Sequence, residues 1–187
     1  MGADRSLRAA VEAAIDEHRF DAVTLEQIAE HAGINRVTLY RRGHTREALL
    51  TETAAAAAAE FRDGSLAALT HPGRAPERLG VLVDALFDLA DRHLGLLAGL
   101  YDGPTAVFHL ATDDDDALTR LEYTEPFERI LSDGAAEGTL DSQHPAEDAE
   151  VLFNLLGWTY IHLRRSHGWP PAQARHATLR QLRYPTS

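Results

Sequence analysis

The sequence predicts an all-α protein, and three observations support that fold class. Apolar residues recur every three or four positions along much of the 187-residue chain, which is the period of an amphipathic helix. No segment shows the clean alternation of apolar and polar residues that is typical of a half-buried strand. Helix caps, glycines and prolines divide the chain into successive helical segments.

The first predicted helix covers residues 5–19, with an apolar residue at every fourth position on one face. Thr24 begins the second helix, since Gln27 stands where a capping box needs a side chain that reaches back to the cap. Gly33 ends this helix, because glycine readily adopts the left-handed conformation found after a helix. These signals predict two short helices joined by a tight turn.

Asn35 is the predicted cap of a third helix over residues 36–42, which Gly43 closes. Thr45 caps the next helix, and this helix runs through six consecutive alanines at 54–59. Alanine has the highest intrinsic helix propensity, so we expect this segment to be a stiff connector.

The rest of the chain is predicted to be helical between proline- and glycine-containing breaks. Helices are expected over residues 76–100, 106–133 and 146–166, with a last helix of about a dozen residues after Pro170 and Pro171. Residues 135–145 are expected to be a loop. Gly95 and Gly99 lie in an apolar stretch, where they favour close helix packing or a bend near a pocket.

Composition excludes several classes of protein. The chain has no cysteine, which rules out disulfides, thiolate metal sites and cysteine nucleophiles. Its first eight residues carry charges and no apolar run, unlike a signal peptide, and the chain has no run of 18 apolar residues that would predict a membrane span. We therefore expect a cytoplasmic protein. The formal net charge of −11 argues against nucleic-acid binding only if it is taken over the whole chain.

Residues 24–43 have the spacing of a helix-turn-helix motif. Leu39 is expected to point inward, and a step of about 100° per residue then places Arg36, Val37, Tyr40 and Arg41 on the outer face. Residues 34–50 contain four arginines and one glutamate, a local charge of +3. A small, basic, hydrogen-bonding face of this kind suits the major groove of DNA.

The residues Thr-Leu-Glu-Gln-Ile-Ala-Glu-His-Ala-Gly-Ile-Asn-Arg-Val-Thr-Leu-Tyr at 24–40, with Thr-Arg-Glu-Ala-Leu-Leu at 45–50, resemble the TetR family of transcriptional repressors. The resemblance covers about residues 5–50. It implies a homodimer of about nine helices per subunit, with a helix-turn-helix DNA-binding domain at 1–50. Residues 51–187 would form a helical domain for ligand binding and dimerisation. Its activity would be that of a repressor which a small ligand releases from a palindromic operator.

The resemblance also assigns roles by position. Arg36, Val37 and Thr38 would face base edges and nearby phosphates, whereas Tyr40, Arg41, Thr24 and Arg46 would contact the DNA backbone. The DNA-binding surface so predicted comprises Thr24, Asn35, Arg36, Val37, Thr38, Tyr40, Arg41, His44 and Arg46. The chain departs from the family at Arg42, Gly43 and His44, where many members have bulky residues, and Phe20 is positioned to compensate.

Most aromatic residues follow position 76, in the region that the resemblance assigns to the ligand. The predicted pocket residues are Phe87, Tyr101, Phe108, His109, Tyr123, Phe127, Trp158 and His162. An apolar or aromatic effector is the expected ligand. The helix at 146–166 has an apolar arc wider than one intramolecular contact needs, which predicts a twofold interface, although a central core helix would look the same. The predicted interface residues are Val151, Leu152, Leu155, Trp158, Thr159 and Leu163.

No metal site, cofactor or catalytic cluster is predicted. The ten histidines are scattered, and the closest pair, His162 and His167, is five residues apart rather than the three or four that share a helical face. The four aspartates at 113–116 are expected to be a solvated loop or a helix start. Two alternatives stay open: an all-α enzyme in the C-terminal bundle, and a ligand-independent architectural or protein-binding dimer. A C-terminal cavity filled by side chains would favour the second alternative.

Overall fold

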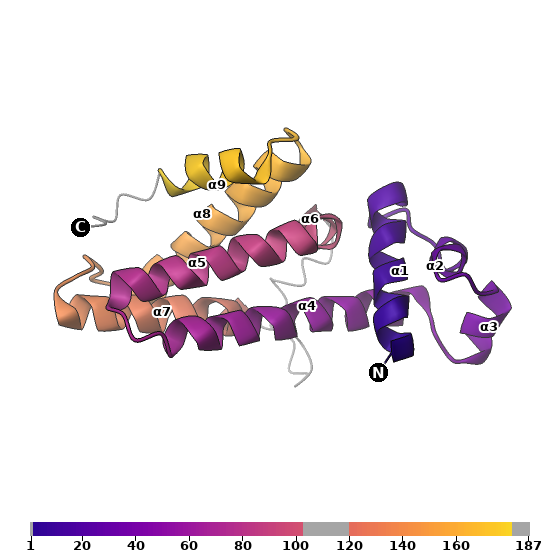
Figure 1. Ribbon diagram of the computed structural model, residues 1–187, viewed down its shortest axis with the longest axis horizontal. Coiled ribbons are helices and arrows are strands. Elements are labelled where there is room, and N and C mark those ends of the chain that lie inside the picture. Colours follow the sequence, from indigo (N-terminus) through magenta and orange to yellow (C-terminus); the bar gives the residue numbers. More distant parts are fainter. Residues whose placement is uncertain (1, 103–119, 181–187) are drawn as a thin grey trace.

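The computed structural model describes residues 2–102 and 120–180, which form nine α-helices and contain no strand. Three short helices, α1 (Gly2–His18), α2 (Leu25–His31) and α3 (Arg36–Arg41), form a small domain at one end of the molecule (Figure 1). The other helices form a larger bundle. The structure thus has the all-α class and the N-terminal three-helix domain that the sequence predicts.

The local signals at the N-terminus act as expected. Thr24 and Gln27 form a reciprocal capping box at the start of α2, and the Asn35 side chain accepts a hydrogen bond of 2.8 Å from the backbone N–H of Val37. Gly33 and Gly43 have φ angles of +65° and +82°, which residues with a side chain rarely adopt. The turns on both sides of α3 are therefore set by the residues within them.

Helix α4 (Arg46–Leu69) connects the two parts of the molecule (Figure 1). Its 24 residues span about 36 Å at the rise of an α-helix. Several of its alanines are buried, and their small side chains allow neighbouring helices to approach closely. The alanine-rich connector predicted from the sequence is confirmed.

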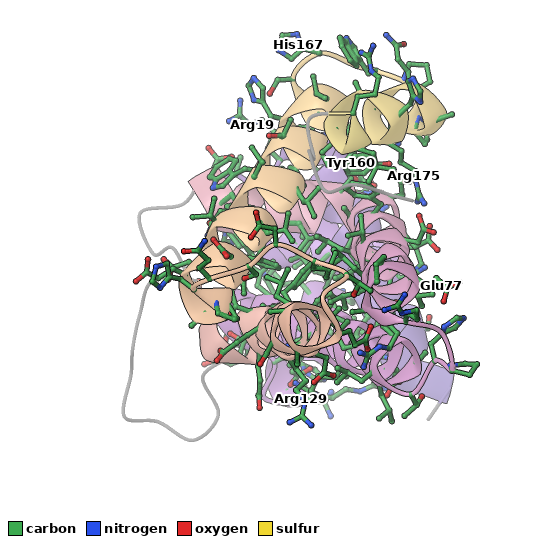
Figure 2. The ribbon with its side chains drawn as sticks, turned by 90° about the vertical axis from the view of Figure 1, so that its left-hand side faces the viewer. Arg19, Glu77, Arg129, Tyr160, His167 and Arg175 are labelled. Carbon is green, nitrogen blue, oxygen red and sulfur yellow. The ribbon has the colours of Figure 1, made fainter. Side chains whose placement is uncertain are left out.

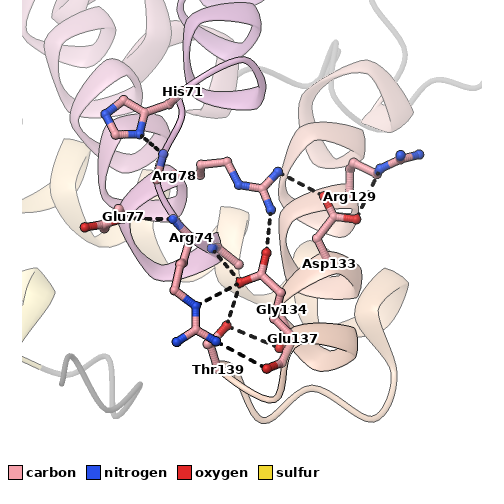
Figure 3. A network of polar contacts seen from close by, with 11 residues as sticks. His71, Arg74, Glu77, Arg78, Arg129, Asp133, Gly134, Glu137 and Thr139 are labelled. Carbon is pink, nitrogen blue, oxygen red and sulfur yellow. Dashed lines mark hydrogen bonds and ion pairs between the residues drawn. The ribbon is translucent and has the colours of Figure 1, made fainter.

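The bundle contains α5 (Ala75–Arg92), α6 (Leu94–Asp102), α7 (Arg120–Glu137), α8 (Pro145–Arg165) and α9 (Pro171–Leu179). Helices α5 and α7 are joined by ion pairs at one end, where Arg78 lies 2.9 Å from Asp133 and 3.4 Å from Glu137 (Figure 3). Helix α9 packs against α8, and its Arg175 donates hydrogen bonds to Asp88 and Asp91 of α5. Figure 2 shows Arg175 close to Tyr160 of α8.

Two helix boundaries differ from the prediction. The single helix expected over 76–100 is broken at His93, whose backbone (φ −119°, ψ 31°) leaves the helical region so that α6 can turn towards α1. Helix α7 continues through residues 135–137, which were expected to be loop, until Gly138 ends it with a φ of +66°. Expectations for residues 106–119, including the aspartates at 113–116, lie outside the described residues.

Candidate functional site

Helix α3 exposes a face that carries both charged and apolar side chains, and one buried side chain, Leu39, packs the helix against the rest of the domain. Leu39 is completely buried, whereas Val37 is 60% exposed and Tyr40 is 75% exposed. Arg36 and Arg41 are exposed beside them. The outward face predicted from the helical period is therefore present, and nothing in the described part of the chain covers it.

The other predicted DNA-binding residues surround this face. Asn35 and Thr24 are exposed at the N-termini of α3 and α2, where their side chains accept hydrogen bonds from backbone N–H groups. Thr38 and His44 are half-buried. Both helix N-termini carry partial positive charge, which favours contact with phosphate.

Arg46 differs from the other cationic residues of this surface. Its guanidinium donates hydrogen bonds of 2.6 Å to the carbonyl oxygen of Val23 and 2.7 Å to that of Phe20. These bonds attach the start of α4 to the loop between α1 and α2. Arg46 thus has a structural role that its predicted phosphate contact did not include.

A small apolar cavity lies inside the larger bundle. Its volume is about 20 Å³, and it is lined by residues of α5 to α8: Leu86, Phe87, Leu89, Ala90, Leu97, Tyr101, Tyr123, Phe153, Gly157, Tyr160 and Ile161. Pockets for drug-sized ligands are usually about 300–1,000 Å³. The described side chains therefore almost fill this space, which has room for about one water molecule.

Three of the predicted pocket residues, Phe87, Tyr101 and Tyr123, line the cavity. Phe127 is buried beside Phe153 but does not border the cavity. Trp158 and His162 are exposed on α8, and Phe108 and His109 lie outside the described residues. Burial raises the pKa of the Tyr101 phenol to about 12, so this group stays protonated at physiological pH.

A larger hollow of about 760 Å³ lies on the surface between α4, α5 and α7. Its lining is mostly charged and includes Arg78, Arg129 and Asp133, three residues of the ion-pair network in Figure 3. Because it is open and much of its charge is paired, it suits an apolar ligand less well than the small apolar cavity does.

Helix α8 has an exposed apolar row. Val151 is 66% exposed, Leu155 is 44% exposed and Trp158 is 37% exposed, with the Trp158 ring against Tyr101 at 4.1 Å between centroids. Thr159 and Leu163 are half-buried. Leu152 is only 3% exposed, because it lies on the inner face of α8 and packs into the core. Its side chain is directed away from the surface where a partner was predicted.

Comparison with known proteins agrees with this geometry. Residues 7–53 match the family model for bacterial regulatory proteins of the tetR family. The match includes most of α1, both helices of the helix-turn-helix and the start of α4. Residues 7–53 therefore form a DNA-binding domain of the tetR-family type.

Solved structures with low sequence identity share the whole fold. PfmR, a TetR-family transcriptional regulator from Thermus thermophilus, matches with a TM-score of 0.76 and 19% identity over 98% of this chain and 100% of that chain. A TetR/AcrR-family regulator from Thermobifida fusca matches with a TM-score of 0.69 and 19% identity, over 98% of this chain and 100% of that chain. KstR2, a ketosteroid transcriptional regulator of Mycobacterium tuberculosis, matches with a TM-score of 0.71 and 18% identity, over 96% of this chain and 90% of that chain. A search of curated proteins found no match.

A tetR-type domain at residues 7–53, on a chain with the fold of TetR-family regulators, is that of a DNA-binding transcriptional regulator, and repression is the typical role in that family. Members of the family are generally non-enzymatic and bind DNA as dimers. No helix in the described part of the chain is long and apolar enough to cross a membrane.

Sequence reasoning did not find the junction between the TetR-type DNA-binding domain and the bundle. The His93 ring lies between two carboxylates, with Nδ1 2.6 Å from Glu12 of α1 and Nε2 3.2 Å from Glu60 of α4. Burial favours the neutral imidazole, but the hydrogen bonds to both glutamates outweigh burial and raise the pKa of His93. The spacing of these three residues in the sequence gives no signal of their contact.

Two glycines complete this junction. A side chain at Gly95 would meet Asp16 and the Ile15 Cγ2 atom at 3.2 Å, and one at Gly99 would overlap Phe20. Close helix packing, which the sequence predicts at both positions, is confirmed. Phe20 lies against α6, so the residue expected to fill a gap near α3 also joins the DNA-binding domain to the bundle.

Proposed function

We propose that this chain is a dimeric repressor that binds a palindromic operator through α3. The observation that carries the proposal is the exposed face of α3, on which Val37 and Tyr40 stand free of the core beside Arg36 and Arg41. On this face an apolar side chain such as Val37 can contact a thymine methyl group, and the Tyr40 hydroxyl can donate to a phosphate. Arginines at the same face supply bidentate contacts to guanine and contacts to phosphate.

The charge of the chain is compatible with this proposal. Affinity for DNA depends on the few cations that reach phosphates, and each contact adds about −0.9 to the slope of log K against log salt. The +3 segment at residues 34–50 lies at the DNA-binding end of the molecule, whereas most of the excess acid is in the bundle. We therefore expect steep salt dependence despite the net charge of −11.

Selection of bound DNA from a random pool, at two salt concentrations, tests operator binding. We expect a palindrome whose half-sites are about 34–36 Å apart or a multiple of this spacing, because two recognition helices of a symmetric dimer must enter successive major grooves. Recovery of no preferred sequence at low salt would contradict operator recognition. As a DNA-binding regulator, the protein is expected to act in the cytoplasm.

The second part of the proposal is that the partner copy covers the exposed row of α8. Leu155→Arg should produce a monomer in sedimentation velocity, since a buried arginine without a partner is strongly unfavourable. Leu66→Arg is the matched control, because Leu66 is 61% exposed on α4 and lies outside this row. A dimer that persists in Leu155→Arg but is lost in Leu66→Arg would move the interface to α4.

Release by an effector is the third part. The cavity between α5 and α8 is apolar and aromatic, so we propose an apolar or aromatic compound, a chemistry also suggested by the similar fold of a ketosteroid transcriptional regulator. A volume of about 20 Å³ means that such a compound must push these helices apart. It would then favour a bundle different from the DNA-binding one, which is how a ligand shifts a two-state population.

The filled cavity also favours a second candidate, a DNA-binding dimer that needs no effector. Thermal melting with a panel of steroids, fatty acids and small aromatic compounds distinguishes the two. Stabilisation by one compound, together with loss of operator binding, supports the effector proposal. If no compound in the panel changes either quantity, the ligand-independent regulator is favoured.

A further inference from the structure

Two histidines and a glutamate meet where α1 and α2 end. Glu17 and His18 occupy the last turn of α1, and His31 is the last residue of α2. One carboxylate oxygen of Glu17 lies 3.2 Å from Nε2 of His31, and the other lies 3.8 Å from Nε2 of His18. The three donor atoms all lie within 4.8 Å of one another.

This donor set has the chemistry of a transition-metal site. Imidazole nitrogen and carboxylate oxygen are common zinc ligands, at about 2.0–2.2 Å from the ion. Two such ligands on a tetrahedral ion are about 3.3 Å apart, so the observed spacing requires only small side-chain rotations. The side chain of Glu17 is 62% exposed, whereas those of His18 and His31 are 30% and 26% exposed and therefore better fixed, although His31 as a whole residue is exposed at the end of α2.

The surroundings do not supply a competing partner for this carboxylate. In the described part of the chain, the ion-pair partners of Glu17 are His18 and His31 themselves. Arg19, the nearest cation along the chain, pairs instead with Asp21 at 3.4 Å. The two imidazole rings meet edge-on with 6.3 Å between centroids, so both nitrogens can face one point near the carboxylate.

We propose that Glu17, His18 and His31 bind a divalent zinc ion, with water at the fourth position. The ion would join the C-terminal ends of α1 and α2. Because His31 directly precedes the turn that leads to α3, the ion would also hold the base of the recognition helix. This inference rests on the fold of the DNA-binding domain and does not depend on the proposed operator, dimer or effector.

The site could not be inferred from spacing along the chain. Glu17 and His31 are separated by a complete loop and helix, and only the fold brings them together. The other neighbouring histidines, His162 and His167, are both exposed and have ring centroids 5.0 Å apart. Among the described residues, no acidic side chain joins this pair to form a group of three possible metal ligands. This pair therefore serves as an internal control.

The test uses the untagged full chain, freed of metal, and Zn²⁺ as the probe. Isothermal titration in the presence of a competing chelator should show one ion per chain at this site. Glu17→Gln and His31→Ala should each weaken its binding at least tenfold, whereas His167→Ala should not change it. Glu17→Gln keeps the shape of the side chain, so it still tests the site if His31→Ala alters the end of α2. Circular dichroism should show that each variant is folded.

Thermal melting gives a second readout. With free Zn²⁺ at about 100 times the dissociation constant, the folding equilibrium of the site-bearing unit should rise about 100-fold in the wild type and much less in Glu17→Gln. Zinc binding that is absent, equal in all variants, or lost only in His167→Ala would overturn the proposal. Loss of zinc binding in Glu17→Gln and in His31→Ala, but not in His167→Ala, would establish the site.

Discussion

The contact of His93 with Glu12 and Glu60 gives the sharpest prediction for the stability of this protein. His93 is only 8% exposed, and each of its ring nitrogens faces a carboxylate, so the ring can donate to both carboxylates only as an imidazolium. Glu60 also accepts a hydrogen bond of 3.0 Å from Arg92. Desolvation would raise the pKa of Glu60, but the bonds from His93 and Arg92 outweigh it and lower that pKa.

The magnitude follows from the two hydrogen bonds. A hydrogen bond to a charged group contributes about 1.5–3 kcal/mol. The bond to Glu12 is part-buried and counts in that range, whereas Glu60 is 45% exposed and is held by Arg92 as well, so its share is closer to the 0–1 kcal/mol of a surface pair. His93→Gln keeps one neutral hydrogen bond of about 1 kcal/mol. We expect a net loss of roughly 0.5–3 kcal/mol, which corresponds to about 1–12 °C in melting temperature.

The dependence on pH has a definite sign. The pKa of His93 is raised in the folded state, so its contribution is complete below the unfolded value near 6.5 and is lost as the pH rises through the folded pKa. The pKa of Glu60 is lowered, so its contribution is lost only as the pH falls through that lower value. The contact should therefore be strongest at about pH 5–6 and weaken on the alkaline side.

Thermal unfolding followed by circular dichroism, at pH 6 and at pH 9, measures both effects. The wild type should lose more stability than His93→Gln between these two values, because only the wild type has a proton to release at this position. His176→Gln, at an exposed position in α9, controls for the general effect of replacing a histidine. If the wild type and His93→Gln lose the same stability with pH, the imidazolium interpretation is refuted.

Three further predictions concern the recognition helix, the junction and the α9 contact. Arg36→Ala should relax base preference in a DNA-binding assay, whereas Tyr40→Ala should weaken binding to all sequences alike. Gly99→Ala should destabilise the chain by about 1–3 kcal/mol in urea unfolding, because the new methyl group overlaps Phe20. Asp91→Asn should cost about 2–4 kcal/mol, since two arginines and a tyrosine lose their shared carboxylate.

Each of these has a control in the chain. Gly80→Ala in α5 meets no atom within 4 Å and should raise stability by about 0.5–1 kcal/mol through helix propensity, so a loss there would show that any alanine is harmful. Asp84→Asn removes a partner 3.8 Å from Arg175 that is 68% exposed, and it should have almost no effect. Equal effects of Arg36→Ala and Tyr40→Ala on every DNA sequence would contradict the assigned roles.

The helix-turn-helix could be predicted closely because its signals are local. Capping by Thr24 and Asn35 and the left-handed conformations of Gly33 and Gly43 are properties of residues within three or four positions of each boundary. The break at His93 has no such signal, since neither proline nor glycine stands there. It depends on carboxylates 81 and 33 residues away, which no local pattern can indicate.

The cavity shows the same limit. Phe87, Phe127 and Phe153 are all apolar residues on predicted helices, and their sequence context does not distinguish the residues that line a space from those that fill the core. Phe153 and Tyr160 line the cavity but were not among the predicted pocket residues. Which of these side chains face the space depends on how the four helices that line it pack together, and the packing of the complete bundle sets that arrangement.

Helix α6 contacts both functional ends of the molecule. Leu97 and Tyr101 line the cavity, while Gly95 and Gly99, on the same nine-residue helix, lie against α1 and Phe20. A ligand that enlarges a cavity of about 20 Å³ must displace some of its walls. If α6 is the wall that moves, the close contacts at Gly95 and Gly99 should transmit the movement to the DNA-binding domain, because packed interiors resist continuous deformation. We therefore expect Gly99→Ala to alter DNA affinity as well as stability, and an effect on stability alone would assign the moving wall to another helix.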